Sequence, residues 1–499
     1  MTPLSEIWAM APLLIVATTA LLLVVLSAWR STAAAGGLAA SLAAIGALLA
    51  LAASVTPLVL GIDLPATLFS GALNADSFSQ ITQAGLLLAV AAGLWAMRGM
   101  IEAHHIARPE WSALVLIATL GMMVTVAAND FIVLYVGLEL QALCLYILAA
   151  LRRDDPRSVE AGLKYVVLGG LASGIFLFGL SLVYGASGQL SYDAMASAFT
   201  PGGKPAPLMM AGLVLLLAGL MFKLAAAPFH MWAPDVYQGA PTPSVVIFAA
   251  APKLAAIAVL VRVVWDPLAE WSEVWQPVIV VVATVSMAIG ALAALAQQDL
   301  KRLLAYSAIG HAGYALLGLA AAQREGAGAA LAYVIFYLPA AIVALSVLAA
   351  LRQDGQPVQT LSALTGLSRR HPGAALTMTA ALLSLAGVPP LAGFFGKFFI
   401  FVPLIQAGMA PLAIFGAVTS VVAAAYYLRV VHAIYDDPER ARPIRMHAVG
   451  PGEFLPSFGL RAVTLVAGLA LLAGPFVAGP VMSLADAALA PLFSTAPPS

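Results

Sequence analysis

The sequence predicts an all-α polytopic membrane protein with about fourteen transmembrane helices, two of which are broken. Hydrophobic side chains make up 62% of the 499 residues, and charged side chains make up only 9%. Soluble domains carry roughly 25% charged residues, so this chain cannot cover a soluble surface. The charges cluster between long apolar runs. In a bilayer such runs must be helical, because every backbone polar group there needs an internal partner.

Fourteen stretches meet the requirement of about 20 predominantly apolar residues for a spanning helix. The N-terminus lacks the positive charges of a signal peptide, so we expect the first stretch to be retained. The predicted spans are 7–29, 33–58, 76–97, 110–128, 130–151, 158–185, 207–230, 242–265, 274–296, 300–322, 327–351, 372–407, 410–435 and 459–490.

The twelfth stretch, 372–407, is too long for one straight crossing and too short for two. Its centre, Gly387 to Gly393, contains two consecutive prolines, and the seventh stretch runs into prolines from Pro228 onward. Proline removes a helical hydrogen bond, so we expect both helices to be broken. Carbonyl groups freed at membrane depth are tolerated where they line protein or water, which predicts hydrated cavities beside both breaks.

The basic residues favour an orientation with both termini on the periplasmic side. In that orientation 16 of the 23 basic residues lie in inside loops, as the positive-inside rule requires. Splitting the twelfth stretch into two spans would move the basic group at 429–461 outside, which also supports one broken helix. The inside residues are Arg30, Arg98, Arg108, Arg152, Arg153, Arg157, Lys301, Arg302, Arg352, Arg369, Arg370, Arg429, Arg440, Arg442, Arg445 and Arg461.

The two broken helices occupy matching places in a repeat. Lys223 of the seventh span follows Glu139 by 84 residues, and Lys397 of the twelfth follows His311 by 86 residues. The repeat advances by five helices, an odd number, so helices 4–8 and helices 9–13 are predicted to be two inverted repeats. The expected regions are helices 1–3 in 1–105, the first repeat in 106–268, the second repeat in 269–436, and a connector with helix 14 in 437–499.

Composition excludes several functions for this chain. The formal net charge is zero, so nothing suggests a surface for nucleic acid. The single cysteine, Cys144, lies in an apolar run and cannot provide a disulfide framework or a cysteine-ligated cluster by itself. The sequence contains no dinucleotide or Walker A glycine pattern. We therefore expect no cofactor in this chain.

Five charged residues are the candidate proton-transfer groups: four lysines assigned to predicted spans and one glutamate deep in a span. A charge at bilayer depth is costly and marks a functional site by default. Desolvation favours a neutral amine, so a buried lysine is suited to exchanging protons at physiological pH. Breaks adjoin Lys223 and Lys397, and Lys253 follows Pro252 in mid-span, which favours proton transfer over a structural role. The five are Glu139, Lys164, Lys223, Lys253 and Lys397.

Glu139 lies about nine residues into the fifth span, close to mid-membrane. If it approaches Lys164 on the next helix, the two ions offset each other's burial cost and form a switchable pair. The alternative is that Lys164 extends to the membrane surface or pairs with Glu160 one turn away.

Histidines and loop carboxylates have simpler alternatives. His230 is either a relay group or a hydrogen-bonded residue of the helix break, and His311 is either a relay group near mid-helix or a core histidine. His104 and His105 are expected to be solvated in a loop. The carboxylates at span ends are expected to be helix caps. These are Asp63, Asp76, Asp235 and Asp299.

Several motifs together resemble the subunit N family of the bacterial proton-pumping NADH:quinone oxidoreductase, respiratory complex I. The most specific is FKLAAAPFHMWAPDVYQGAPTP at 222–243. It is accompanied by LELQAL at 138–143, EAGLKY at 160–165, QQDLKRLLAYSAIGHAGY at 297–314 and GVPPLAGFFGK at 387–397. The resemblance covers essentially the whole chain.

The resemblance implies a proton relay. It assigns Glu139 and Lys164 to a control pair and Lys223 to the proton site of helix 7. It assigns Lys253 and His311 to the connection along the membrane plane, and Lys397 to the outside exit. It also implies a multi-pass protein of the bacterial inner membrane that contacts the antiporter-like subunit M and small membrane subunits. NADH, FMN, iron–sulfur clusters and quinone would bind to other subunits.

Two other functions remain open on the sequence. The same plan occurs in the large subunits of multisubunit monovalent cation/proton antiporters. Alternatively, the chain is a structural spacer whose charges hold helices together, in which case replacing the lysines would prevent assembly of the complex.

Overall fold

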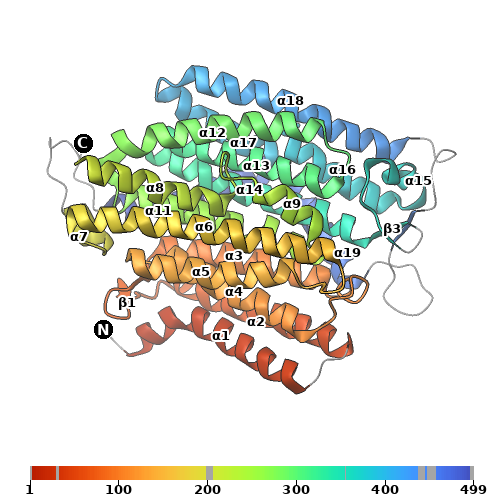
Figure 1. Ribbon diagram of the computed structural model, residues 1–499, viewed down its shortest axis with the longest axis horizontal. Helices are drawn as coiled ribbons and strands as arrows, with labels where there is room; N and C mark the ends of the chain where they lie inside the picture. Colours follow the sequence, from red (N-terminus) through yellow and green to blue (C-terminus); the bar gives the residue numbers. More distant parts are fainter. Residues whose placement is uncertain are drawn as a thin grey trace.

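The computed structural model describes residues 3–29, 33–197, 206–353, 356–436, 444–446 and 457–494. Long helices run side by side in one bundle (Figure 1). Among the described residues, 13 helices are long and apolar enough to cross a membrane. The predicted all-α membrane fold is confirmed.

The helices are α1 Pro3–Trp29, α2 Ala33–Leu60, α3 Ser77–Met97, α4 Pro109–Ala127, α5 Phe131–Ala149, α6 Pro156–Ser187, α7 Tyr192–Ser197, α8 Pro207–Leu224, α9 Trp232–Gly239, α10 Thr242–Ala249, α11 Ala251–Trp265, α12 Ser272–Leu295, α13 Leu300–Ala320, α14 Arg324–Ala350, α15 Leu367–Arg370, α16 Pro372–Ala386, α17 Ala392–Gln406, α18 Ala410–Tyr435, α19 Phe458–Leu472 and α20 Gly474–Ser494. Two short antiparallel sheets pair β1 Thr67–Leu68 with β2 Leu73–Asn74, and β3 Leu351–Gln353 with β4 Gln356–Pro357 and β5 Ile444–Met446.

The seventh and twelfth spans are broken, as predicted. The seventh consists of α8 and α9, and α8 is followed by Ala225, whose φ of 60° is left-handed. The twelfth consists of α16 and α17, and α16 is followed by Gly387, which has a φ of 86°. Side chains satisfy the freed amides: Ala227 donates to Ser286 Oγ at 2.8 Å, and Gly393 donates to Ser384 Oγ at 3.0 Å.

Two further spans are divided, which the sequence analysis did not predict. The eighth consists of α10 and α11, since Pro252 at the start of α11 has no amide proton and Ala250 leaves the helical region. The fourteenth, expected as one helix over 459–490, consists of α19 and α20. Gly474 begins α20 there, and a Cβ at this position would lie 2.6 Å from the Pro390 carbonyl oxygen. The second division therefore lets α20 approach the break in the twelfth span.

Close glycine contacts recur at equivalent places in the two predicted repeats. A Cβ on Gly137 of α5 would lie 2.7 Å from Thr125 of α4. In the other half, a Cβ on Gly290 of α12 would lie 2.4 Å from the Gly310 nitrogen of α13. These tight helix pairs immediately precede Glu139 and His311 in their helices. The backbone positions of both residues are therefore fixed by helix packing.

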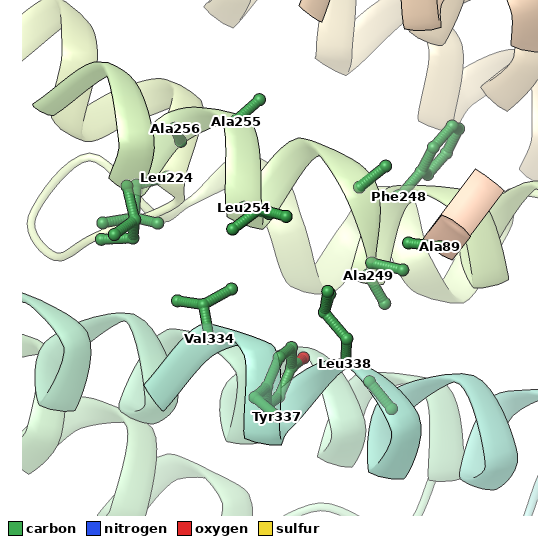
Figure 2. Packing of buried hydrophobic residues seen from close by; sticks show 14 of the residues in the cluster. Ala89, Leu224, Phe248, Ala249, Leu254, Ala255, Ala256, Val334, Tyr337 and Leu338 are labelled. Atoms are coloured by element: carbon green, nitrogen blue, oxygen red, sulfur yellow. The ribbon is translucent and has the colours of Figure 1, made fainter. Parts of the chain in front are cut away.

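An apolar interface joins the eighth span to α14. Figure 2 shows Ala249 and Leu254 of α10 and α11 facing Val334 and Leu338 of α14, and all four are buried. The same part of α11 carries Lys253, which is 5% exposed. Apolar packing thus keeps this lysine at depth.

The first and last helices share one end of the bundle. The hairpin around Leu68 packs on Met10 near the start of α1. Ser77, which follows this hairpin, donates to the Ala487 carbonyl near the end of α20 at 3.2 Å. Which side of the membrane this end faces stays a prediction. Three residues used in that prediction lie outside the described residues, namely Arg30, Arg440 and Arg442.

The expectation that His104 is solvated was wrong. His104 is 2% exposed, and its Nε2 donates to the Ala349 carbonyl at 2.9 Å. The pKa of His104 is lowered well below its usual value, mainly by burial and secondly by the nearby charge of Arg352. The loop between α3 and α4 is therefore docked on the end of α14.

We expect the folded protein to lose stability as the pH falls below about 6.5, because the unfolded chain then binds a proton that buried His104 rejects. Thermal unfolding of the solubilised protein at pH 8 and pH 5.5 measures this loss. His104→Gln should reduce it. His105→Gln, which changes the neighbouring exposed histidine, is the matched control. Equal pH dependence in all three proteins would contradict the assignment.

Candidate functional site

The first ion pair of the site joins Glu139 of α5 to Lys223 of α8. Lys223 Nζ lies 3.4 Å from Glu139 Oε1, and the two side chains are 10% and 24% exposed. Ser173 of α6 donates its hydroxyl to the same carboxylate oxygen. Three helices thus meet at this carboxylate, and Lys223 is held within one turn of the break that ends α8.

Lys164 does not pair with Glu139, contrary to the expected control pair. Its Nζ lies 2.7 Å from Glu160 and 2.8 Å from Asp235. Ser173, which contacts Glu139, follows Lys164 by nine residues on α6, a distance of about 14 Å along the helix. The side chain cannot span that distance, so the alternative pairing with Glu160 is the one observed.

Asp235 has a larger role than the helix cap expected from the sequence. Besides Lys164 of α6, it binds Arg302 Nη1 of α13 at 2.5 Å. Gln238 reinforces the same junction by donating to Asp299 at 3.1 Å. The half-helix α9 therefore ties the first half of the bundle to the second. Sequence reasoning missed this role because Asp235 and Arg302 are far apart in the chain.

Lys253 lies beside Lys223 at the first break. Its Nζ donates to the carbonyl of Leu224, the last residue of α8. Both lysines line one small cavity between α5, α6, α8, α9, α10 and α11. The other lining residues are Gln141, Ala142, Leu145, Tyr146, Tyr165, Trp232, Phe248 and Pro252. The predicted cavity beside the first break is present.

His311 is hydrogen-bonded on both ring nitrogens. Nδ1 lies 2.6 Å from the Tyr333 hydroxyl and Nε2 lies 2.9 Å from the Tyr427 hydroxyl. Tyr427 also bonds the hydroxyl of Ser307. The ring is 8% exposed. This buried chain of hydroxyl groups fits both a relay group and a core histidine.

Lys397 lies against the second break. Its Nζ donates to the Ala386 carbonyl at 2.8 Å and to Ser420 Oγ at 2.7 Å, and it lies 5.0 Å from the ring centroid of Tyr314. A small cavity has both Lys397 and His311 in its lining. Each break therefore has a lysine bound to a carbonyl group that ends a half-helix.

His230 stands apart from this arrangement. It lies in the turn between α8 and α9, and its Nδ1 has no hydrogen-bond partner among the described residues. It does not line the cavity shared by Lys223 and Lys253. Its relay role stays a prediction.

Comparisons with a family model and with similar proteins agree with the family that the sequence motifs indicate. Residues 128–423 match the family model described as NADH:quinone oxidoreductase/Mrp antiporter, TM. The chain is 44% identical to NADH-quinone oxidoreductase subunit N of Rhodospirillum rubrum over 87% of this chain and 88% of the relative. It is 42% identical to the corresponding subunit of Azorhizobium caulinodans over 98% and 99%.

Solved structures share the fold. A chain of respiratory complex I from Thermus thermophilus superposes with a TM-score of 0.78 at 36% identity, covering 95% of this chain and 99% of that chain. A chain of the Mrp complex from Dietzia gives a TM-score of 0.81 at 22% identity, covering 99% and 98%, which shows a common fold alone. On the sequence identities and coverage, this chain belongs to the family of NADH-quinone oxidoreductase subunit N.

Proposed function

We propose that the chain is a proton-translocating subunit of a bacterial NADH:quinone oxidoreductase, driven by quinone reduction elsewhere in the complex. One observation carries the proposal: Lys253 and Lys397 each donate to carbonyl groups at the broken ends of a membrane helix. A buried ammonium held by carbonyl oxygens is stabilised without a permanent counter-ion. A change in nearby charge can therefore shift its proton affinity.

In the proposed relay, protons pass from the Glu139–Lys223 pair to Lys253, His311 and Lys397. Opening the Glu139–Lys223 pair would leave an unpaired buried ammonium, which favours loss of its proton. The shared cavities support transfer from Lys223 to Lys253 and from His311 to Lys397. Lys164 lies near the end of α6 that we assign to the inside, where it is ion-paired with Asp235. Its charge is proposed to control the relay. Lys397 is proposed to face the outside exit.

The proposed setting follows the names of the relatives. They support other membrane subunits as partners, which we propose are the antiporter-like subunit M and small membrane subunits. NADH, FMN, iron–sulfur clusters and quinone are proposed to bind elsewhere in the complex. The family of the relatives supports a bacterial inner-membrane location. The distribution of basic residues supports placing both termini in the periplasm.

Replacing Lys397 tests the relay against a purely structural role. Lys397→Ala and Lys397→Arg are both expected to lower NADH-driven proton pumping at least about tenfold, since arginine keeps the charge but does not release its proton. A spacer predicts that arginine restores function and that alanine prevents assembly. The measurement is dye-reported pumping by the assembled enzyme in liposomes.

Co-purification decides between the oxidoreductase and an independent antiporter. The tagged chain should copurify with NADH-oxidising activity. Isolation without that activity, but with sodium- or potassium-dependent proton exchange, would favour the antiporter.

A further inference from the structure

Two polar side chains that line the cavity shared by Lys223 and Lys253 lack hydrogen-bond partners within the part of the chain that the structure describes. Gln141 and Tyr146, both on α5, are 4% and 5% exposed. Neither Gln141 Oε1 nor the Tyr146 hydroxyl has a partner among the described residues. Buried polar groups are nearly always hydrogen-bonded, by protein or by an ordered water, because leaving one unsatisfied costs free energy.

Both side chains line the cavity that contains Lys223 and Lys253. Its size suits a single water molecule, and a buried water typically makes two to four hydrogen bonds. A water molecule here can accept hydrogen bonds from the ammonium groups of the two lysines. It can donate its own hydrogens to Gln141 Oε1 and the Tyr146 oxygen. The water molecule then forms a hydrogen bond with each of the four polar groups.

The helix packing fixes the position of the Tyr146 hydroxyl. Gly169 of α6 lies directly against it, and a Cβ on Gly169 would come within 1.9 Å of the hydroxyl oxygen. One turn further along α6, Ser173 bonds Glu139, which is on the same face of α5 as Tyr146. Any side chain at 169 would therefore displace the hydroxyl from its place on this face.

We propose that Gln141 and Tyr146 are positioning residues that hold a water bridging Lys223 to Lys253, with Gly169 providing the space for the tyrosine hydroxyl. This inference rests on the proposed proton relay and deepens it. The bridge provides the hydrogen-bonded connection through which a proton leaves the ion-paired lysine for the carbonyl-bound one. Neither residue accepts the proton permanently.

Three substitutions test the bridge in the assembled enzyme. Tyr146→Phe removes only the hydroxyl, Gln141→Leu removes the acceptor, and Gly169→Ala displaces the hydroxyl. Each should slow NADH-driven pumping on the order of fivefold, the effect of losing one hydrogen bond in a transfer step. Gly170→Ala is the matched control, because a Cβ there meets nothing within 4 Å. It should pump normally.

A water-resolving structure of the complex gives the second readout. It should show a solvent peak between the two lysines in the native enzyme and none in Tyr146→Phe. A dry native cavity would overturn the proposal, and so would normal pumping by Tyr146→Phe in an assembled complex. If Lys223→Ala abolishes pumping while these variants pump normally, the bridge alone is wrong. If Lys223→Ala pumps normally, the proposed relay itself fails.

Discussion

Replacing Lys223 with alanine is expected to lower proton pumping by the assembled enzyme at least about tenfold, since a positioned proton-transfer group typically contributes about a hundredfold or more. The substitution removes the ammonium 3.4 Å from Glu139 and leaves that carboxylate, among the described residues, with only the Ser173 hydroxyl as a hydrogen-bond partner. The measurement is the initial pumping rate in liposomes, with assembly checked by native electrophoresis.

The partner substitution tests whether these residues act as a unit. Glu139→Gln should also depress pumping, and the Lys223→Ala/Glu139→Gln double variant should be less impaired than the product of the two single effects, because both remove one interaction. Arg324→Ala provides the comparison, since the exposed Arg324 lies outside the relay and should leave the effect of Glu139→Gln unchanged. Independent effects of Glu139 and Lys223 would show that the pair has no functional coupling.

Replacing Arg262 with alanine is expected to have the largest effect on stability. Arg262 of α11 is 1% exposed, and its Nη2 donates to both carboxylate oxygens of Asp76 at 2.8 and 3.0 Å. Burial alone would raise the pKa of Asp76, but the charge and hydrogen bonds of Arg262 outweigh it and lower that pKa. Removing one member of a buried pair costs about 3–5 kcal/mol, since the other charge is left uncompensated. Denaturant unfolding in micelles measures the loss.

Arg324 provides the control for this prediction. It is an exposed arginine that stacks on Phe493, and Arg324→Ala should change the free energy of unfolding by about 0.5 kcal/mol or less. Arg262→Lys keeps the charge but lacks the second guanidinium nitrogen, Nη1, which lies 3.8 Å from Asp266, so an intermediate loss is expected. Equal stability of Arg262→Ala and Arg324→Ala would show that the buried pair contributes nothing.

The breaks in the seventh and twelfth spans were predictable because proline chemistry acts locally. Pro228 and Pro390 lack the amide proton that a helix needs, whatever surrounds them. The depth of Lys253 was predictable for a similar reason, since the length of an apolar run determines where its centre lies. Such properties belong to one segment of chain.

Pairings between segments were not predictable in the same way. Lys164 was expected beside Glu139 because the two lie on consecutive spans, yet antiparallel helices bring together only residues at the same height. Asp235 reaches Arg302 only because α9 packs against both α6 and α13. His104 is buried because a loop docks on α14, which no local pattern records.

The most direct test of the account is the number of protons pumped per NADH oxidised by the reconstituted Lys223→Arg enzyme. Arginine keeps the positive charge beside Glu139 but does not release its proton, so assembly is expected to persist. If protons pass through Lys223, the ratio will fall below that of the native enzyme measured in parallel. A native ratio in the assembled variant would contradict the proposed path.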